Sequence, residues 1–328
     1  MVLVTGANGF LGGWVVRSLL QQGLQVRILA REKSDLSDLA GLIFEKSMGD
    51  VTDYPSVLKA LEGIKSVFHL AGVIGYQKWQ RPLMEQVNIG GTKNILKACK
   101  EKGIKDFVYL SSVVAIGAGF KSTQILNEDS SYNISHLHLG YFDTKHEAEK
   151  LVIEAHEKGD IEAVILNPST MYGAGDSKKG SRKTQLKVAQ GKFPFYTHGG
   201  VNVIAVEDAI TGIMTAWKGR HAGERFILSG ENLLIKDLFS LIALEAGAKA
   251  PSIGIPNSVI FGLGRWGDFK HSMGRPASLS VENAWSSTLY HYFDNTKAKK
   301  VLGLQPRPAK LAISASVAWI KAQGLLKT

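Results

Sequence analysis

Residues 1–13 read MVLVTGANGFLGG, and this stretch decides the fold of the chain. Met1–Thr5 is a short apolar run of the kind that forms a buried parallel strand. Three glycines follow at the spacing G-x-x-G-x-x-G, namely Gly6, Gly9 and Gly12. Trp14–Gln22 then carries apolar residues at helical spacing. A strand, a glycine-rich turn and an amphipathic helix in this order predict the start of a β-α-β unit.

Segments typical of strands and of helices keep alternating after this unit. The further predicted strands are Leu24–Ala30, Leu42–Lys46, Ser66–Leu70, Asp106–Leu110 and Glu162–Leu166, and the helices between them are Tyr54–Leu61, Met84–Cys99 and Tyr141–Glu157. This alternation is typical of an α/β fold with a doubly wound parallel sheet of the Rossmann type. We expect residues 1–168 to form this dinucleotide-binding domain. Residues 169–328 are expected to form mainly a smaller C-terminal substrate-binding lobe, with segments near 201–217 and 225–229 rejoining the Rossmann domain.

The composition excludes several classes of protein. The chain has 328 residues, a formal net charge of +10 and one cysteine, Cys99. A single cysteine permits neither an internal disulfide nor a thiolate cluster, and we predict no metal site. No apolar run approaches the roughly 18 residues that a membrane span needs. With no transmembrane segment and no signal peptide before the first strand, we expect a cytoplasmic protein.

Two stretches allow more than one interpretation. The basic cluster consists of Lys178, Lys179, Arg182, Lys183 and Lys187. We interpret it as a solvated surface and expect no nucleic-acid partner, because no aromatic residues are interleaved with basic ones as in a nucleic-acid module. The second stretch, Ile253–Trp266, is apolar with few charges. We favour a lobe helix packed on the core over peripheral membrane contact.

The glycine turn is also the first candidate binding site. Glycines let backbone N–H groups approach a pyrophosphate, and a helix N-terminus adds partial positive charge. An acidic residue after the second strand usually binds the ribose hydroxyls of NAD. This chain has Arg31 there, and an arginine can hold a 2′-phosphate. We therefore predict NADP as the cofactor, with NAD as the alternative. Asp50-Val51 after the third strand and Leu70–Gly72 after the fourth are expected to line the dinucleotide.

Tyr141 and Lys145 form a Y-x-x-x-K pair at the start of a predicted helix. Residues four apart share one helix face, and an ammonium group beside a phenol lowers the pKa of the phenol. Such a tyrosine can exchange a proton with a substrate oxygen while a hydride is transferred. Ser111 and Ser112 follow the preceding strand at the carboxyl edge, where doubly wound sheets bind ligands. A hydroxyl at that edge can orient a carbonyl group.

These segments together resemble the extended branch of the short-chain dehydrogenase/reductase superfamily. The matching motifs are Thr5–Gly12, His69–Gly72, Asn88–Thr92, Tyr109–Ser112, Tyr141–Lys145 and Asn167–Ser169. Within that branch the chain looks most similar to dihydroflavonol reductase-like proteins and to the NAD(P)-dependent epimerase/dehydratase family. The resemblance spans roughly residues 1–230 in the same order.

The resemblance implies a role for each matching residue. Tyr141 is the expected acid/base, Lys145 its activator and a ribose ligand, and Ser112 the group that orients the carbonyl. The residues expected to bind the cofactor are Gly6, Gly9, Phe10, Leu11, Gly12, Arg31, Asp50, Val51, Leu70, Ala71, Gly72, Asn88, Lys145, Pro168 and Ser169. The resemblance also implies a homodimer that pairs helices Met84–Cys99 and Tyr141–Glu157 across a two-fold axis.

Departures from the family pattern narrow the expected function. Val113-Val114 stands where dehydratases carry an Asp-Glu pair, and Asn167 stands where many relatives have arginine. These changes favour a substrate less polar than a nucleotide sugar. We expect an NADP-dependent carbonyl reductase or alcohol dehydrogenase that acts on a small aromatic or apolar ketone or aldehyde. The alternatives are an NAD(P)-dependent nucleotide-sugar epimerase and a non-catalytic dinucleotide-sensing protein.

Aromatic and neighbouring residues supply the candidate substrate pocket. They are Tyr76, Trp79, Tyr132, His136, His138, Met171, Tyr172, Phe195 and Tyr196. Rings offer area and stacking to a flat apolar compound, although each residue taken singly fits the core of the lobe better. His136 and His138 precede Tyr141 and are considered for a proton relay. A loop histidine without a role is the preferred interpretation.

Overall fold

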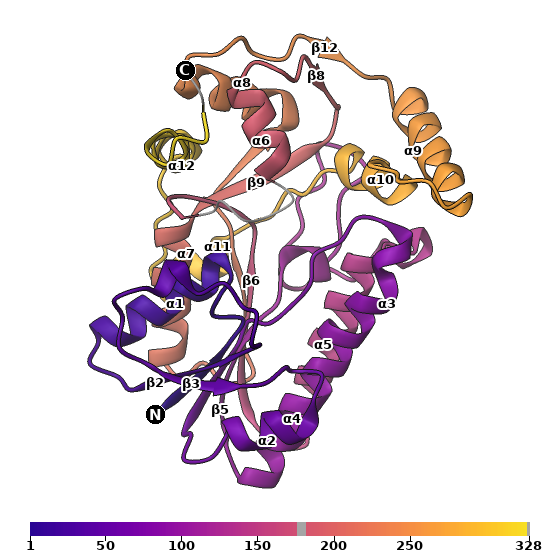
Figure 1. Ribbon diagram of the computed structural model, residues 1–328. Helices are drawn as coiled ribbons and strands as arrows, with labels where there is room; N and C mark the ends of the chain where they lie inside the picture. The colour runs from indigo at the N-terminus through magenta and orange to yellow at the C-terminus, as the bar shows by residue number, and fades with distance from the viewer. Residues whose placement is uncertain (176–181, 327–328) are drawn as a thin grey trace.

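A computed structural model describes residues 1–175 and 182–326, except for the side chain of Arg182. Its centre is a seven-stranded sheet with the order β10-β6-β5-β4-β1-β2-β3, and every neighbouring pair runs parallel (Figure 1). The strands are β1 Val2–Thr5, β2 Val26–Ala30, β3 Glu45–Met48, β4 Ser66–His69, β5 Asp106–Leu110, β6 Glu162–Pro168 and β10 Arg225–Leu228. The predicted doubly wound Rossmann-type fold is confirmed.

Alternate residues of the central strands belong to two separate cores. Val2 and Val4 of β1 face one core and Leu3 faces the other, because successive side chains of a strand point to opposite faces. The first core is covered by α1 Phe10–Gln21, α7 Val206–Lys218 and α11 Thr296–Leu302, and the second by α2 Tyr54–Ala60, α4 Gly91–Lys102 and α5 Gly140–Glu157. The sheet is thus buried on both sides, as its apolar strands require.

Parallel strands bring the turns that follow them to one edge of the sheet. These turns begin at Gly6 after β1, Leu70 after β4, Ser111 after β5 and Ser169 after β6. The chain order reverses between β1 and its neighbour β4. Ligands of doubly wound sheets bind in the crevice at such a reversal, so the fold itself indicates where to look for a site.

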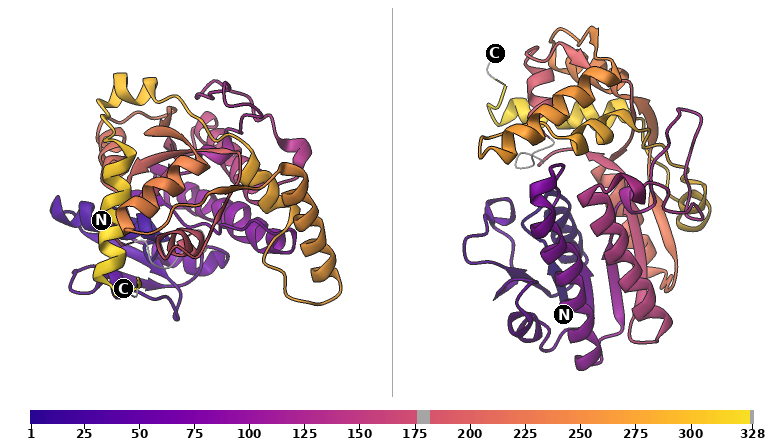
Figure 2. Two further views of the ribbon diagram at one scale, coloured as in Figure 1. Left: turned by 90° about the horizontal axis from the view of Figure 1, so that it is seen from above. Right: turned by 90° about the vertical axis from the view of Figure 1, so that its right-hand side faces the viewer.

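A smaller lobe lies beyond this carboxyl edge (Figures 1 and 2). Its strands are β7 Thr170–Tyr172, β9 Gly200–Ala205 and β11 Glu231–Leu234 in one sheet, and β8 Phe195–Tyr196 with β12 Ile253–Gly254 in another. Its helices are α6 Arg182–Ala189, α8 Ile235–Ala246, α9 Asn257–Ser272, α10 Val281–Thr288 and α12 Ala309–Ala322. None of the helices in the described ranges is both long and apolar enough to cross a membrane.

The long helix predicted over Met84–Cys99 is present, but it is not α-helical throughout. The segment begins as α3 Arg81–Met84, passes through a π-helical stretch at Glu85–Gly90 and continues as α4 to Lys102. The side chain of Asn88, in the π-helical stretch, is buried and bonded to neighbouring elements. Such stretches often occur at functional sites, and apolar spacing alone does not reveal them.

Two further boundaries differ from the prediction. The third strand is β3 Glu45–Met48 rather than Leu42–Lys46, because the apolar Leu42 and Phe44 pack on the first core before the strand begins. The first helix begins at Phe10 rather than Trp14, because the glycines pack closely against the turn instead of delaying the helix.

Phe226 tests whether β10 is an integral part of the main sheet. Its side chain is fully buried in the first core. We predict that Phe226→Ala lowers the free energy of unfolding by about 3–5 kcal/mol in urea denaturation, because it removes buried surface and leaves a cavity. Ile43→Ala at a 91% exposed position is the control and should change it by less than about 0.5 kcal/mol. A loss below about 1 kcal/mol for Phe226→Ala would contradict the packing described.

Candidate active site

The glycine turn brings the first helix against the first strand. Gly6 has a φ of +71°, a left-handed conformation that favours glycine. A Cβ atom on Gly12 would lie 2.1 Å from the Gly6 carbonyl oxygen, so the close packing of α1 on the turn requires glycine. No side chain caps the amino end of α1, and its first turn holds no acidic residue. The turn therefore presents a partially positive helix end of the kind that binds phosphate groups.

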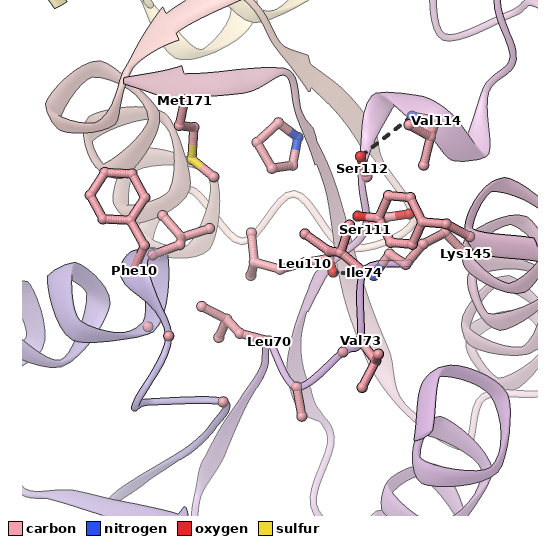
Figure 3. Close-up of a pocket in the computed structure, with 18 of the residues that line it drawn as sticks. Phe10, Leu70, Val73, Ile74, Leu110, Ser111, Ser112, Val114, Lys145 and Met171 are labelled. Atoms are coloured by element: carbon pink, nitrogen blue, oxygen red, sulfur yellow. Dashed lines mark hydrogen bonds between the residues drawn. The ribbon is translucent and has the colours of Figure 1, made fainter. Parts of the chain in front are cut away.

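This turn forms one wall of a cavity of about 590 Å³ at the carboxyl edge of the sheet. The predicted site residues that line the cavity are Gly6, Gly9, Phe10, Leu11, Gly12, Arg31, Asp50, Val51, Leu70, Ala71, Gly72, Ser112, Tyr141, Lys145, Pro168 and Ser169. Figure 3 shows Phe10 and Met171 on one side of the cavity and Ser112 and Lys145 on the other. Of the predicted catalytic and cofactor-binding residues, only Asn88 does not line it.

Arg31 lies at the end of the cavity near β2 and β3. It follows β2 directly, and its side chain is 69% exposed. Its Nε atom lies 3.8 Å from Oδ2 of Asp50, whose Oδ1 accepts hydrogen bonds from the backbone and hydroxyl of Thr52 at 2.9 Å. Ser34 lines the same cavity. The guanidinium group is therefore accessible to an anion at this end.

Asn88 lies behind the cavity wall and bonds two segments that form it. Its side-chain oxygen accepts a hydrogen bond from the Val73 backbone at 2.8 Å, and its side-chain nitrogen donates to the Thr144 hydroxyl at 3.0 Å. A Cβ atom on Gly72 would lie 3.3 Å from the same Asn88 oxygen. Asn88 thus fixes the loop after β4 to helix α5, and does not reach the cavity itself.

Lys145 ties helix α5 to the end of β5. Its side chain is buried, and its Nζ atom donates a hydrogen bond to the Leu110 carbonyl oxygen at 2.8 Å. The ammonium group also lies 4.9 Å from the centre of the Tyr109 ring. Burial lowers the pKa of Lys145 to about 8, and the negative charge of Glu149 partly opposes this shift.

Tyr141 stands one helical turn before Lys145 and is buried at the cavity wall. Its ring meets the edge of the Tyr76 ring, with the two centres 5.9 Å apart. Burial raises the pKa of Tyr141 to about 12, and a hydrogen bond with Ser112 opposes this rise. The sequence predicted a pKa below the ordinary value of a phenol, and this direction is wrong, because desolvation of the buried phenol outweighs the effects that lower its pKa.

Two serines follow β5 and both line the cavity. Ser112 caps a short 3₁₀ turn, where its Oγ atom accepts from the Val114 backbone at 3.4 Å, and it also bonds Tyr141. The hydroxyl of Ser111 is buried and has no hydrogen-bond partner among the described residues. Ser112 is therefore the serine in contact with the tyrosine, while Ser111 brings an unsatisfied hydroxyl to the same wall.

A buried polar network supports this wall from behind. The Asn167 side-chain nitrogen donates to Glu149 Oε2 at 2.7 Å and to the Ser112 carbonyl oxygen at 2.9 Å. Arg225 completes the network through an ion pair of 2.9 Å with Glu149 Oε1. Glu149 and Arg225 were not predicted from the sequence. The one hint of this network in the sequence is Asn167, which stands where many relatives have arginine. In the structure the positive charge beside Glu149 comes instead from Arg225 of the neighbouring strand β10.

Much of the remaining lining of the cavity is apolar. Its apolar residues include Val73, Ile74, Tyr76, Val113, Val114, Phe142, Met171, Tyr172, Val201, Ile235, Leu238 and Phe239. Ser286 and His291 also line the cavity. His291 is linked through Nε2 to the Ser286 carbonyl oxygen at 3.0 Å, and burial lowers its pKa. Arg31 and Lys145 are the only arginine and lysine among the described lining residues.

The predicted substrate-pocket residues separate into two groups. Tyr76, Met171 and Tyr172 line the cavity. The other six candidates do not line it, which agrees with the preference for a role outside the pocket for each residue taken singly; they are Trp79, Tyr132, His136, His138, Phe195 and Tyr196. Most of them interact elsewhere: the Trp79 ring stacks on His271 with centres 3.8 Å apart, and the Tyr132 hydroxyl donates to Asp143 at 2.7 Å. Aromatic composition did not separate ligand-facing rings from packing ones.

The basic cluster lies only partly within the described residues. Lys178 and Lys179 fall outside them, as does the side chain of Arg182. Lys183 and Lys187 are exposed on α6 and do not line the cavity. Within the described ranges, no group of three or more His, Cys, Asp or Glu residues is arranged to hold a metal ion.

Comparisons with known proteins agree with this geometry. Residues 3–207 match the family described as "3-beta hydroxysteroid dehydrogenase/isomerase family". A Synechocystis protein named "Putative dihydroflavonol 4-reductase" is 32% identical, over 99% of this chain and 96% of that protein. Sterol demethylase protein B of Methylococcus capsulatus is 27% identical over 99% of both. The crystal structure of gox2253 superposes with a TM-score of 0.88 at 32% identity, covering 100% of this chain and 99% of that one.

The burial of Lys145 predicts a pH-dependent stability. Its pKa falls from an ordinary 10.5 to about 8 in the folded protein, so the unfolded chain binds more protons between these values. The free energy of unfolding should therefore rise with pH in this window by up to about 3 kcal/mol relative to a Lys145→Met variant. Urea denaturation of both proteins from pH 7 to 10.5 measures the difference. A difference that stays constant with pH would contradict the prediction.

Proposed function

The chain belongs to the 3-beta hydroxysteroid dehydrogenase/isomerase family of extended short-chain dehydrogenases/reductases, and from this premise we propose that it is an NADP-dependent carbonyl reductase or alcohol dehydrogenase. It is an NAD(P)-dependent oxidoreductase, as its relatives are. The proposed substrate is an apolar, ring-bearing ketone or aldehyde, or the corresponding alcohol. The observation that carries the proposal is the position of Tyr141, Lys145 and Ser112 on one wall of a cavity whose opposite wall is the glycine turn.

The cavity fits a nicotinamide dinucleotide. A Cβ atom on Gly6 or Gly12 would collide with the backbone of neighbouring residues, so the turn packs closely against α1. The end of α1 is uncapped there, and such a helix end suits a pyrophosphate. At one end Arg31 and Ser34 suit a ribose 2′-phosphate, and no acidic residue directly follows β2 to bind a free ribose 2′-hydroxyl. These features support NADP over NAD. Pro168 and Ser169 at the end of β6 would then adjoin the nicotinamide.

The apolar part of the cavity lining supports the choice of substrate. A nucleotide sugar brings a diphosphate, which proteins bind with cations or helix ends. Lys145 is the only lysine or arginine of the described lining apart from Arg31, and its bond to the Leu110 carbonyl directs it to the sheet. A ring-bearing carbonyl compound instead buries its surface against Tyr76, Phe142 and their neighbours. The names of the relatives, a dihydroflavonol reductase and a sterol demethylase protein, agree with such a substrate.

The mechanism follows from three side chains. A bound reduced dinucleotide supplies the hydride. Tyr141, whose pKa of about 12 keeps its hydroxyl protonated at neutral pH, donates that proton to the substrate oxygen in the direction of reduction. Ser112 hydrogen-bonds the same oxygen and aligns it with the phenol. The positive charge of Lys145, one turn away on α5, stabilises the phenolate left behind.

The substrate lobe completes the proposed division of labour. We assign dinucleotide binding to the Rossmann sheet and substrate binding to the lobe formed by residues after 168, although β10 lies in the main sheet.

Two alternative functions remain to be tested. They are a nucleotide-sugar epimerase, which would copurify with tightly held dinucleotide, and a sensor without turnover. A homodimer through α4 and α5 is a further proposal, which a light-scattering mass of twice 35.6 kDa would support and a mass of 35.6 kDa would contradict. A cytoplasmic location stays a prediction.

Tyr141→Phe tests the proposed acid. The substitution removes the proton donor and keeps the ring, so we predict a 10²- to 10⁴-fold loss of NADPH-dependent turnover of an aromatic ketone with NADPH affinity unchanged. Tyr132→Phe is the matched control, since this tyrosine does not line the cavity; it should retain nearly full turnover. Equal turnover by Tyr141→Phe and the wild type would remove the tyrosine from the mechanism.

Arg31→Ala tests the choice of cofactor. Loss of a charge-assisted hydrogen bond to the 2′-phosphate should weaken NADPH binding by about 10- to 100-fold. NADH affinity, measured in parallel by calorimetric titration, should change by less than about threefold, since that cofactor has no such phosphate. Lys33→Ala removes an exposed cation that does not line the cavity and serves as the control. An equal loss of affinity for both cofactors would contradict this assignment.

A further inference from the structure

Helix α9 lies at the outer end of the lobe (Figure 1), and it exposes a row of large apolar side chains. The row, called the α9 stripe below, consists of Val259 (48% exposed), Leu263 (44%), Trp266 (59%), Phe269 (52%) and Met273 (47%), the last directly after the helix. Steps of three and four residues place side chains on one side of a helix. Single exposed apolar residues are ordinary, but a continuous row of five is typical of a surface that contacts another protein, a ligand or a membrane.

The opposite side of α9 packs tightly against the lobe, so the side that carries the stripe faces solvent. Ile260 is buried there. A Cβ atom on Gly264 would lie 2.7 Å from the Ser280 carbonyl oxygen, and one on Gly267 would lie 2.0 Å from that of Leu279. These glycines let α9 lie directly against the chain leading into α10. The sequence expectation of a helix packed on the core therefore holds for this side only, and the stripe faces outward.

The charges around the stripe are those that attract an anionic surface. Arg265 and Arg275 are exposed, and Lys270 lies at the same end of the helix. The only acidic residue between 257 and 279 is Asp268, which is half-buried and accepts a hydrogen bond from the Val281 backbone. An exposed apolar face with arginine and lysine beside it is typical of helices that lie in the headgroup region of a bilayer.

Helix α9 adjoins elements that contribute residues to the lining of the cavity. Helix α9 packs on α10, which carries the cavity residue Ser286. The loop from β4 also reaches the segment between α9 and α10, since the Gln77 side chain donates to the Ala277 carbonyl oxygen at 3.2 Å. In that loop Ile74 lines the cavity and is 47% exposed. Helix α9 is thus connected to the cavity wall through α10 and through this loop.

We propose that α9 docks this protein on the surface of an anionic lipid bilayer. The stripe enters the headgroup region, and Arg265, Lys270 and Arg275 pair with lipid phosphates. The docked orientation places the cavity close to the lipid, so that a membrane-dissolved carbonyl compound can enter without crossing water. This last step rests on the proposed function, whereas the docking itself does not.

Co-sedimentation with vesicles tests the docking. The full chain is mixed with vesicles of phosphatidylcholine alone or with one third phosphatidylglycerol, and the bound fraction is measured without substrate. We expect binding to the anionic vesicles and at least tenfold weaker binding by Leu263→Gln/Trp266→Gln. The control Val301→Gln/Leu311→Gln changes two equally exposed apolar residues on α11 and α12 and should bind as the wild type does. Arg265→Glu/Lys270→Glu should also release the protein, without altering the stripe.

Three results would overturn the proposal. They are no binding to anionic vesicles by the wild type, equal binding by the stripe and control variants, or a light-scattering mass showing a dimer that the stripe substitutions dissociate. The last result would assign the stripe to a second copy of the chain. NADPH-dependent turnover of a water-soluble ketone should be the same in all variants. Its absence in the wild type would contradict the proposed function and leave the vesicle result unaffected.

Discussion

The hydrogen bond from the buried Lys145 ammonium to the Leu110 carbonyl oxygen fixes helix α5 on the end of strand β5. A buried ammonium group is costly unless it is bonded, so this contact sets both the height and the rotation of the helix. Tyr141 lies one turn earlier and is thereby held at the cavity wall beside Ser112. The proposed chemistry depends on this constraint, because a phenol on a helix free to shift could not be aligned with a substrate oxygen.

A polar network lies behind the Lys145–Leu110 hydrogen bond, and the cavity lies in front of it. Behind it, Glu149 is paired with Arg225 and accepts a hydrogen bond from Asn167, which also holds the Ser112 backbone. Glu149 partly opposes the lowering of the Lys145 pKa that burial causes. In front, the lining of the cavity includes the glycine turn and many apolar side chains. That lining supports a charged cofactor at the turn and an uncharged substrate against the apolar side chains.

Local sequence was sufficient to predict the parts of the site that lie in short motifs. The glycine turn and Ser112 directly follow strands, and the Y-x-x-x-K pair lies on one face of one helix. Their positions in the sequence therefore predict that they lie at the carboxyl edge of the sheet, where they line the cavity. The network behind them joins α5 to β6 and β10, and nothing near Arg225 in the sequence indicates that it reaches Glu149. The pKa of Tyr141 was predicted in the wrong direction, because burial is a property of the whole fold. The apolar stretch near Ile253 was likewise ambiguous, since periodicity does not tell which side of a helix the rest of the chain covers.

Deuteride transfer tests the central claim most directly. The protein is incubated with NADPH carrying deuterium at C4 of the nicotinamide, in separate 4R and 4S forms, and with an aromatic ketone. The account predicts one deuterium on the carbinol carbon of the product from one of the two forms, with a matching loss of NADPH. An isomerised product without net NADPH consumption, or no transfer from either form to any apolar carbonyl compound, would contradict it.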